Sequence, residues 1–111
     1  MVRDDPFKTD TRHQRLINSW IKELGMGTQV EYEVGKYFID IYVPDLVLGL
    51  EIDGPWHLRK RDKKRDEYIL EVHGIEIWRI PIKDINMSYK QELVDRIFHR
   101  VREMEQDATT Y

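Results

Sequence analysis

The chain has 111 residues, of which 41% are hydrophobic and 35% are charged, and this composition predicts a single soluble globular domain over residues 1–111. The absence of cysteine excludes disulfides, thiolate zinc sites and a cysteine nucleophile, and it fits a cytoplasmic protein. No apolar run approaches the ~20 residues of a membrane span, and the polar first ten residues do not read as a secretory signal. The net charge of −3 gives no general indication of nucleic-acid binding, although a local cationic patch can still bind phosphate.

The first half of the chain predicts a helix followed by an antiparallel meander. Residues 1–10 are polar and are expected to form an irregular arm. Apolar residues then recur at helical spacing over 12–24, and Thr11 with Gln14 matches a capping box at the start of this helix. Runs of strand-forming residues separated by turn residues predict strands at 28–34, 37–43 and 46–53.

The second half predicts a helix, a strand and a long final helix. An apolar stripe indicates a helix at 60–73, and a strand at 75–82 follows it. A strand, a crossover helix and a further strand imply a parallel pair. Ser88 with Gln91 predicts the capping box of the last helix, which ends in a frayed tail at 107–111. The order of elements predicts an α/β sandwich built on a mixed sheet.

Acidic residues interrupt the apolar strands at two places. Asp40 lies within an apolar, β-branched run, and Glu51 lies near the end of the most apolar strand of the chain. If the second turn is centred at 45–46, Asp40 stands directly opposite Glu51, with Cβ atoms roughly 5 Å apart. A turn at 35–36 also places Glu31 opposite Asp40, so this register predicts a row of carboxylates across three strands.

Carboxylates placed side by side repel each other, and a hard divalent cation offsets this repulsion. Mg²⁺ prefers a few carboxylates together with water and phosphate oxygens, and it activates both a bound water and a phosphoryl group. Asp53 shares the face of Glu51, and His57 follows closely as a side chain that exchanges protons near neutral pH. Asp40, Glu51, Asp53 and His57 are therefore the candidate catalytic residues of a metal site that cuts a phosphodiester.

Other interpretations of these residues stay open. A lone strand acid most often faces solvent, and this is the favoured interpretation of Glu31, with a role as an additional acid as the alternative. Asp53 before Gly54 equally fits turn chemistry. The basic run after His57 is typical of a solvated helix face, but its place beside the acids favours contact with DNA phosphates. The candidate DNA-binding residues are Arg59, Lys60, Arg61, Lys63, Lys64 and Arg65.

A longer motif spans the middle of the chain and consists of Tyr37, Asp40, Leu50, Glu51, Ile52, Asp53, Gly54, His57, Asp62, Arg65, Asp66, Leu70, Gly74, Trp78 and Arg79. This motif resembles the small nucleases related to very short patch repair endonucleases, within the PD-(D/E)XK superfamily. The resemblance covers nearly the whole chain and implies a restriction-endonuclease-like three-layer sandwich. It also implies that Asp40 and Glu51 bind Mg²⁺ or Mn²⁺ with the backbone carbonyl of Ile52, and that His57 is the active-site histidine.

Two positions depart from the superfamily pattern. The superfamily lysine two residues after the second acid is here Asp53, so its water-activating role would pass to His57, to Asp53 itself or to a second metal. Many relatives also carry a glutamate on the first helix, where this chain offers His13 and Gln14. Either Glu31 compensates for that glutamate or the site is weaker.

The sequence therefore predicts a Mg²⁺- or Mn²⁺-dependent DNA endonuclease, a phosphodiester hydrolase. A monomer with one site would nick DNA, whereas a homodimer could cut both strands. The alternatives are a weakly active or inactive nucleic-acid-binding module, and a subunit of a larger restriction or mobile-element system that acts with a protein partner. A further alternative is an α/β interaction domain in which the acids have no catalytic role.

Overall fold

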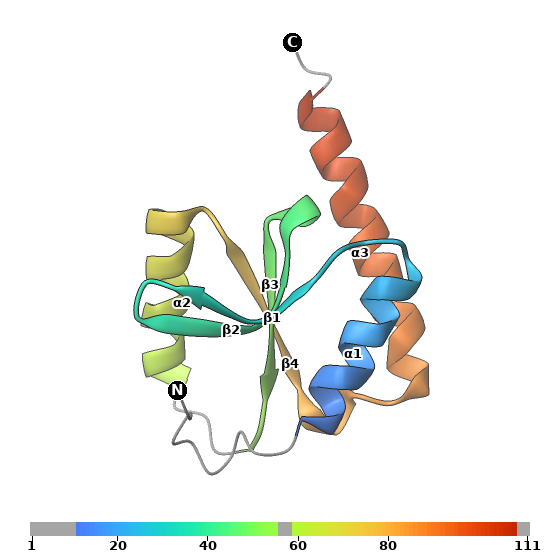
Figure 1. Cartoon of the computed structure of the whole chain (residues 1–111), viewed down its shortest axis with the longest axis horizontal. Helices are drawn as coiled ribbons and strands as arrows, with labels where there is room; N and C mark the ends of the chain where they lie inside the picture. The colour runs from blue at the N-terminus through green and yellow to red at the C-terminus, as the bar shows by residue number, and fades with distance from the viewer. Residues whose placement is uncertain (1–10, 56–58, 109–111) are drawn as a thin grey trace.

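A computed structural model describes residues 11–55 and 59–108 of the chain. Its helices and strands follow in the predicted order of helix, three strands, helix, strand and helix (Figure 1). Two short 3-10 turns, labelled η, are added to that order. The elements are α1 (Arg12–Glu23), β1 (Gln29–Val34), β2 (Tyr37–Val43), η2 (Pro44–Leu46), β3 (Leu48–Asp53), α2 (Arg59–His73), β4 (Glu76–Pro81), η3 (Ile82–Asp84) and α3 (Met87–Ala108).

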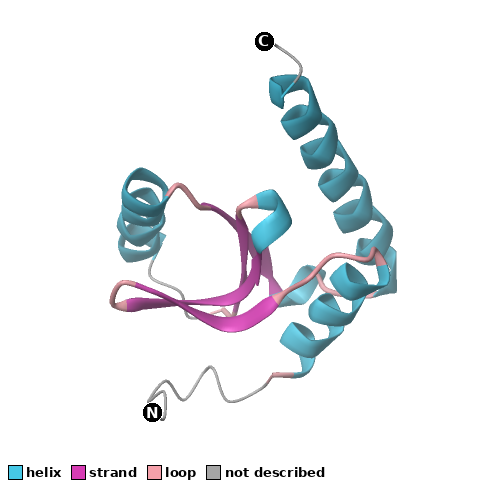
Figure 2. Ribbon diagram, turned by 45° about the horizontal axis from the view of Figure 1, so that its top comes forward, coloured by secondary structure: helices cyan, strands magenta, loops and turns pink. Residues whose placement is uncertain are grey.

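The strands form one sheet in the order β1-β2-β3-β4. Neighbours among β1, β2 and β3 are antiparallel, and β4 joins β3 in parallel. Helix α2 covers one face of this sheet, whereas α1 and α3 cover the other (Figures 1 and 2). The predicted α/β three-layer sandwich with a mixed sheet is confirmed.

The larger of two apolar clusters fills the layer between the sheet and the helices α1 and α3. Helix α1 contributes Ile17, Trp20 and Ile21 to this cluster, and α3 contributes Leu93 and Ile97. Full burial of one such side chain stabilises a fold by about 1.5–3 kcal/mol. The helical spacing of these residues explains why both helices pack on the same face.

The layer beneath α2 contains much less apolar packing. Ile69 is the buried α2 residue of the smaller cluster, where it joins Val34, Ile39 and Ile75. The rest of the predicted apolar stripe is largely exposed, and the adjacent Leu70 is 52% exposed. Most residues of α2 are charged. Contacts between charged groups therefore have to contribute to the position of this helix.

The predicted register of both antiparallel pairs is confirmed, for example by Ile41 opposite Leu50. The connection between β2 and β3 is longer than the predicted two-residue tip, because η2 is followed by Val47 in a left-handed conformation with φ 48°. Strand β3 consequently begins at Leu48 rather than at Leu46. The longer tip extends equally on both sides of its centre, so the register is unchanged.

Both predicted capping boxes are wrong. Thr11 makes no side-chain hydrogen bond at the start of α1. Helix α3 begins at Met87, and Oδ1 of the preceding Asn86 accepts a hydrogen bond from the N–H of Tyr89 at 3.0 Å. Asparagine is among the strongest N-cap residues, so Asn86 takes the role that the sequence pattern assigns to Ser88.

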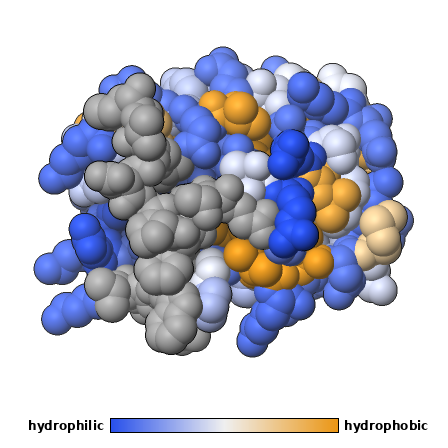
Figure 3. All heavy atoms as spheres, turned by 60° about the horizontal axis from the view of Figure 1, so that its bottom comes forward, coloured by the Kyte–Doolittle hydropathy of each residue, from blue (hydrophilic) through white to orange (hydrophobic). Residues whose placement is uncertain are grey.

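Within the described ranges, no helix combines the length and the apolar character that crossing a bilayer requires. The C-terminal half of α3 extends beyond the other elements (Figures 1 and 2), and α3 continues to Ala108, within the predicted tail. The described residues visible in Figure 3, which turns the end where α1 begins toward the viewer, are mainly hydrophilic with smaller apolar areas. The predicted arm at 1–10 lies outside the described residues.

Candidate active site

Asp40 on β2 and Glu51 on β3 are the buried charged side chains of the described residues, with only 2% and 3% of their surface exposed. A buried carboxylate is strongly disfavoured unless hydrogen bonds or opposite charges compensate for the loss of water. The structure thus brings together, inside the sheet, the two acids that the sequence predicts as a pair.

The two carboxylates bridge their strands reciprocally. The regular antiparallel pairing of β2 with β3 ends at the pair formed by Ile41 and Leu50. Beyond that pair, the N–H of Asp40 donates to Glu51 Oε2 at 2.7 Å, and the N–H of Ile52 donates to Asp40 Oδ2 at 2.8 Å. Each carboxylate therefore takes the place that a backbone carbonyl has in a regular ladder. It satisfies a buried N–H group with a strong, charge-assisted hydrogen bond.

Strand β2 changes the face that its side chains occupy at Asp40. Side chains two residues apart in a regular strand share a face. Yet Ile39 packs in the cluster beneath α2, and Ile41 packs in the cluster beneath α1 and α3. Glu31 lies between the β1 residues that pair with these two isoleucines and has a left-handed φ of 49°. A left-handed backbone is uncommon outside glycine, and it occurs preferentially at functional sites.

The donors at this pair are of the kind that hard divalent ions prefer. Asp40, Glu51 and the carbonyl of Ile52 offer oxygen atoms, which suit Mg²⁺ or Mn²⁺. In the part of the chain that the structure describes, no three His, Cys, Asp or Glu side chains form a complete metal site. Water and substrate oxygens would complete the coordination, as is usual for Mg²⁺. The role of Glu31 as an additional acid stays a prediction.

Arg65 reaches the acid pair from α2. Its Nη2 atom lies 3.6 Å from Glu51 Oε1 and donates a hydrogen bond to the backbone carbonyl of Phe38. Its guanidinium lies 5.5 Å from the centre of the Tyr37 ring, and only 14% of its side chain is exposed. The sequence groups Arg65 with the DNA-binding cations, whereas these contacts direct its charge toward the acids.

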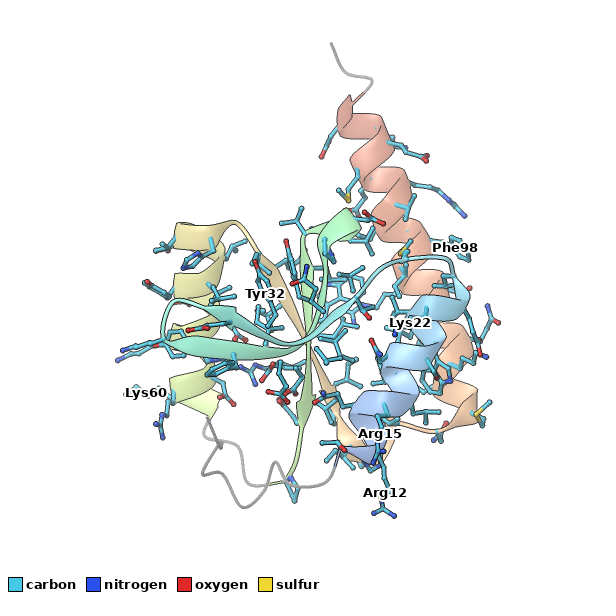
Figure 4. All side chains as sticks on the ribbon, in the orientation of Figure 1. Arg12, Arg15, Lys22, Tyr32, Lys60 and Phe98 are labelled. Atoms are coloured by element: carbon cyan, nitrogen blue, oxygen red, sulfur yellow. The ribbon has the colours of Figure 1, made fainter. Side chains whose placement is uncertain are left out.

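The described cations of the basic run other than Arg65 lie on the surface of α2. Lys60 points away from the body at the start of the helix (Figure 4), and the side chain of Arg59 lies outside the described residues. The starts of α1 and α2 and the carboxyl ends of β3 and β4 lie at the same end of the molecule (Figure 1). The exposed cations of the run are Lys60, Arg61, Lys63 and Lys64.

Arg79 on β4 connects acids of α2 with the end of β3. Its Nε and Nη2 atoms donate to the two oxygens of Asp66, at 2.7 and 2.8 Å, and its Nη1 donates to Asp53 Oδ1 at 2.9 Å. Asp62 Oδ2 lies 3.4 Å from the same Nη1. Burial alone would lower the pKa of Arg79. The hydrogen bond to Asp66 and the charges of Asp66, Asp53 and Asp62 outweigh burial and raise this pKa, so the guanidinium stays charged.

Asp53 lies on the same face of β3 as Glu51, but it pairs with Arg79. A groove of about 510 Å³ opens beside it between α2 and β4, and its lining includes Asp53, Asp66 and Arg79. More acidic than basic side chains line this groove, so its charge does not favour a phosphate group. The catalytic role of Asp53 stays a prediction.

His57 and two positions of the first helix, His13 and Gln14, are the remaining candidates of the sequence prediction. His57 lies outside the described residues, so its role stays a prediction. His13 is half-buried, and its Nδ1 atom finds no hydrogen-bond partner within the described ranges. Gln14 is half-buried as well. Neither of these two positions offers a carboxylate.

Three charged residues beside the site, Asp62, Asp66 and Arg79, have no assigned role in the sequence prediction beyond their place in the motif. A signal for them exists, because the two aspartates are four residues apart in a predicted helix and must share one of its faces. Arg79 lies on the strand that follows this helix. The contact of the two aspartates with Arg79 depends on how α2 packs over β4, and no local sequence pattern predicts that packing.

The sequence matches no family model and no curated protein. Among solved structures, the catalytic domain of the homing endonuclease I-Bth0305I is similar, with a TM-score of 0.50 and 17% sequence identity over 86% of this chain and 93% of that domain. Likeness at this level of identity shows the fold alone. The chain has the fold of an endonuclease catalytic domain, in agreement with the predicted restriction-endonuclease-like sandwich. The finer relation to very short patch repair nucleases stays a prediction.

Proposed function

We propose that this protein is a metal-dependent endonuclease that hydrolyses phosphodiester bonds in DNA. The observation that carries the proposal is the buried pair of Asp40 and Glu51, held between two strands of an endonuclease-like fold. Apolar side chains of similar volume would fill the same space without the penalty of removing two charges from water. A chemical role accounts for the presence of both acids in the core.

Asp40, Glu51 and the backbone carbonyl of Ile52 are assigned as ligands of Mg²⁺ or Mn²⁺. Such an ion, when bound, activates a water molecule and stabilises negative charge on the phosphoryl oxygens. The contribution of the chain is to hold the donors in place. One oxygen of each carboxylate accepts a hydrogen bond from a backbone N–H, which fixes the direction of the carboxylate.

His57 is assigned as general acid or base, because it follows the end of β3 by four residues and histidine exchanges protons near neutral pH. Asp53 receives a hydrogen bond from Arg79 on one oxygen. We therefore assign Asp53 to orient the attacking water rather than to remove its proton. Together, these two residues would take over the task of the superfamily lysine.

Cations at one end of the molecule are assigned to the DNA backbone. Arg12 and Arg15 at the start of α1 point away from the body at the end where α2 also begins (Figures 1 and 4). The positive ends of the two helix dipoles lie there too and attract phosphate groups. Binding of several phosphates releases counterions, so affinity should fall steeply with salt. The α2 residues assigned to this contact are Arg59, Lys60, Arg61, Lys63 and Lys64.

Cleavage of supercoiled plasmid DNA with Mg²⁺ or Mn²⁺ tests the proposed function. The wild-type protein should produce nicked circles if one subunit acts alone, and linear DNA if two act together. Asp40→Asn and Glu51→Gln should each slow cleavage at least about a hundredfold, because even residues that only support metal ligands contribute 10–100-fold. Glu33→Gln, which removes an exposed acid of β1, is the matched control and should keep its activity.

The same assay can refute the proposal. Mismatched and branched DNA should be tested beside the supercoiled plasmid. Failure of the wild-type protein to cut any of these DNAs with either metal would exclude the endonuclease. Equal activity of wild type and Asp40→Asn would remove the acid pair from the mechanism.

A module that binds DNA without cutting it is the second candidate, and Asp53 favours it. The position at which the superfamily carries a lysine here holds an acid that is paired with Arg79. Such a module would bind DNA with the salt dependence of the endonuclease but would leave the plasmid intact with every metal. Measurement of binding and cleavage on the same DNA separates the two candidates.

A further inference from the structure

We propose that Arg65 is a positioning residue for Glu51 and does not contact DNA, although it belongs to the basic run of α2. This inference rests on the proposed function, because it concerns the same acid pair. It divides one continuous run of cations into a surface group that holds DNA and an inner arginine that holds a metal ligand.

The guanidinium of Arg65 is held from several directions. Nη2 donates to the carbonyl of Phe38 and lies 3.6 Å from Glu51 Oε1. Nη1 lies 3.4 Å from Asp66 Oδ1. The ring of Tyr37 lies 5.5 Å away, within the range of a cation–π contact. These contacts come from β2, β3 and α2, so the guanidinium has one defined place in the fold.

The exposure of Arg65 separates it from its neighbours in the run. Only 14% of its side chain is accessible, whereas Arg61, one helical turn earlier, is exposed. A phosphate contact requires N–H groups that face the solvent, where the DNA backbone runs. The N–H groups of Arg65 face a carbonyl and two carboxylates instead.

Arg65 completes the support of Glu51. Oε2 of Glu51 accepts the N–H of Asp40 at 2.7 Å, and Oε1 faces the guanidinium of Arg65. One oxygen of this carboxylate is thus held by a hydrogen bond, and the other lies beside a positive charge. Partners of this kind orient metal ligands, and their loss typically weakens metal affinity or activity 10–100-fold.

Asp66 supports Arg65 and links it to the second arginine of the site. Asp66 Oδ1 lies 3.4 Å from Arg65 Nη1 and accepts a hydrogen bond from Arg79 Nη2 at 2.8 Å. Arg79 in turn binds Asp53 at 2.9 Å. A chain of contacts between charged groups therefore connects Glu51 and Asp53, the two acids on one face of β3, through α2 and β4.

Mn²⁺ affinity of the DNA-free protein, measured by electron paramagnetic resonance, tests the role of Arg65 without reference to activity. Arg65→Gln should weaken Mn²⁺ binding about 10–100-fold. Arg65→Lys keeps the charge but not the fork of donors, and it should recover part of the affinity. Arg61→Gln, which makes the same chemical change at an exposed site of the same helix, should bind Mn²⁺ like the wild type.

DNA affinity measured over a series of salt concentrations, with Ca²⁺ in place of Mg²⁺ to prevent cleavage, provides the reverse comparison. Arg61→Gln should reduce the slope of log affinity against log salt by about 1, because one phosphate contact is lost. Arg65→Gln should leave the slope unchanged.

Two results would overturn the inference while the proposed function stands. The first is an Arg65→Gln protein that binds Mn²⁺ as tightly as the wild type or more tightly, as expected if Arg65 only competed with the metal for Glu51. The second is an Arg65→Gln protein that loses salt slope as Arg61→Gln does. Should Arg65→Gln not fold, Arg65→Lys carries the same comparison. A wild-type protein that neither binds Mn²⁺ nor cuts DNA would instead refute the proposed function.

Discussion

Asp40 and Glu51 accept hydrogen bonds from buried backbone N–H groups of each other's strands, which gives them a structural part in addition to the proposed chemical one. Removal of a buried acceptor leaves its donor unsatisfied, at a cost of about 1–3 kcal/mol. Substitutions that either keep or remove the hydrogen-bond acceptor can therefore separate the structural role from the chemical role.

Asp40→Ala should lower the free energy of unfolding by about 1–3 kcal/mol, because the N–H of Ile52 loses its acceptor. Asp40→Asn keeps an amide oxygen at this place and should lose less stability, although both substitutions should slow cleavage at least about a hundredfold. Urea denaturation followed by circular dichroism measures the difference. An Asp40→Ala protein that is as stable as the wild type or more stable would indicate that repulsion between the acids outweighs their hydrogen bonds.

The acid pair could be predicted from the sequence, but its surroundings could not. Asp40 and Glu51 stand out because their neighbours are apolar, and the register follows from the positions of two turns. The direction of Arg65 could not be predicted, because six cations occur in the seven positions 59–65 and nothing in that run marks one of them as buried. Only the placement of α2 against β2 and β3 shows the difference.

At the scale of the elements, α2 is attached to the sheet largely through charged groups. Its buried apolar contribution to the smaller core cluster is Ile69. Arg79 on β4 binds Asp66 and approaches Asp62, both on α2, and it also binds Asp53 on β3. This arginine therefore holds three elements together beneath the helix that carries Arg65.

Arg79→Met should lower the free energy of unfolding by about 2 kcal/mol, because three aspartates lose their shared cation. Breaking a fully buried ion pair costs roughly 3–5 kcal/mol. The value here should be smaller because the four side chains are 18–24% exposed. Urea denaturation provides the measurement, with Arg102→Met on the exposed surface of α3 as the control. Equal stability of the two variants would contradict the proposed attachment of α2.

The packing between β3 and the layer beneath α2 provides a second prediction. A Cβ atom at Gly49 would lie 2.6 Å from Ile77 Cδ1 and 2.9 Å from Ile39 Cγ2. Gly49→Ala should therefore lower stability by about 1–3 kcal/mol, the usual range for overpacking. Gly27→Ala is the control, since no atom lies within 4 Å of its added Cβ. Thermal unfolding of the two variants should differ, and equal melting temperatures would show that the isoleucines simply move aside.

The elements themselves were largely predictable, because periodicity depends on neighbours in the sequence. Strand β2 spans Tyr37–Val43 as predicted. Caps and turn tips were less predictable, because several residues compete for the same backbone groups, as Asn86 and Ser88 do at the start of α3. The change of face at Asp40 could not be predicted from the local sequence pattern. It becomes visible only when Ile39 and Ile41 are assigned to different apolar clusters.

At the scale of the whole molecule, a net charge of −3 coexists with outward-pointing cations at one end. The starts of α1 and α2 lie at this end with the carboxyl ends of β3 and β4 (Figure 1), and Arg12, Arg15 and Lys60 point outward (Figure 4). DNA that approaches from this end would meet cations and helix N-termini. The acidic groove between α2 and β4 would disfavour a path along the β4 edge.

Removal of two surface cations should weaken DNA binding in a salt-dependent way. The double variant Lys60→Gln/Lys64→Gln should reduce the slope of log affinity against log salt by about 1.8, from two lost phosphate contacts. Lys22 lies toward the other end of α1 (Figure 4), so Lys22→Gln is the control and should leave the slope unchanged. Equal slopes for all three proteins would place the DNA on another surface.

The overall fold was predictable because the order of elements, the two antiparallel registers and the parallel addition of β4 follow from alternation, turns and crossover length. The spatial relation of Arg65 to Arg79 was not predictable, because it depends on the angle at which α2 crosses β3 and β4. The likeness to the I-Bth0305I catalytic domain agrees with the fold and leaves the chemistry to experiment.

Diffraction at a wavelength that reveals manganese would show whether Asp40 and Glu51 together hold a divalent ion. Crystals soaked in Mn²⁺ should show an anomalous peak bonded to an oxygen of Asp40 and to an oxygen of Glu51. The same soak of Asp40→Asn crystals should show a much weaker peak. A peak elsewhere, or no peak between the two acids in a protein that cleaves DNA with Mn²⁺, would contradict the assignment of this site.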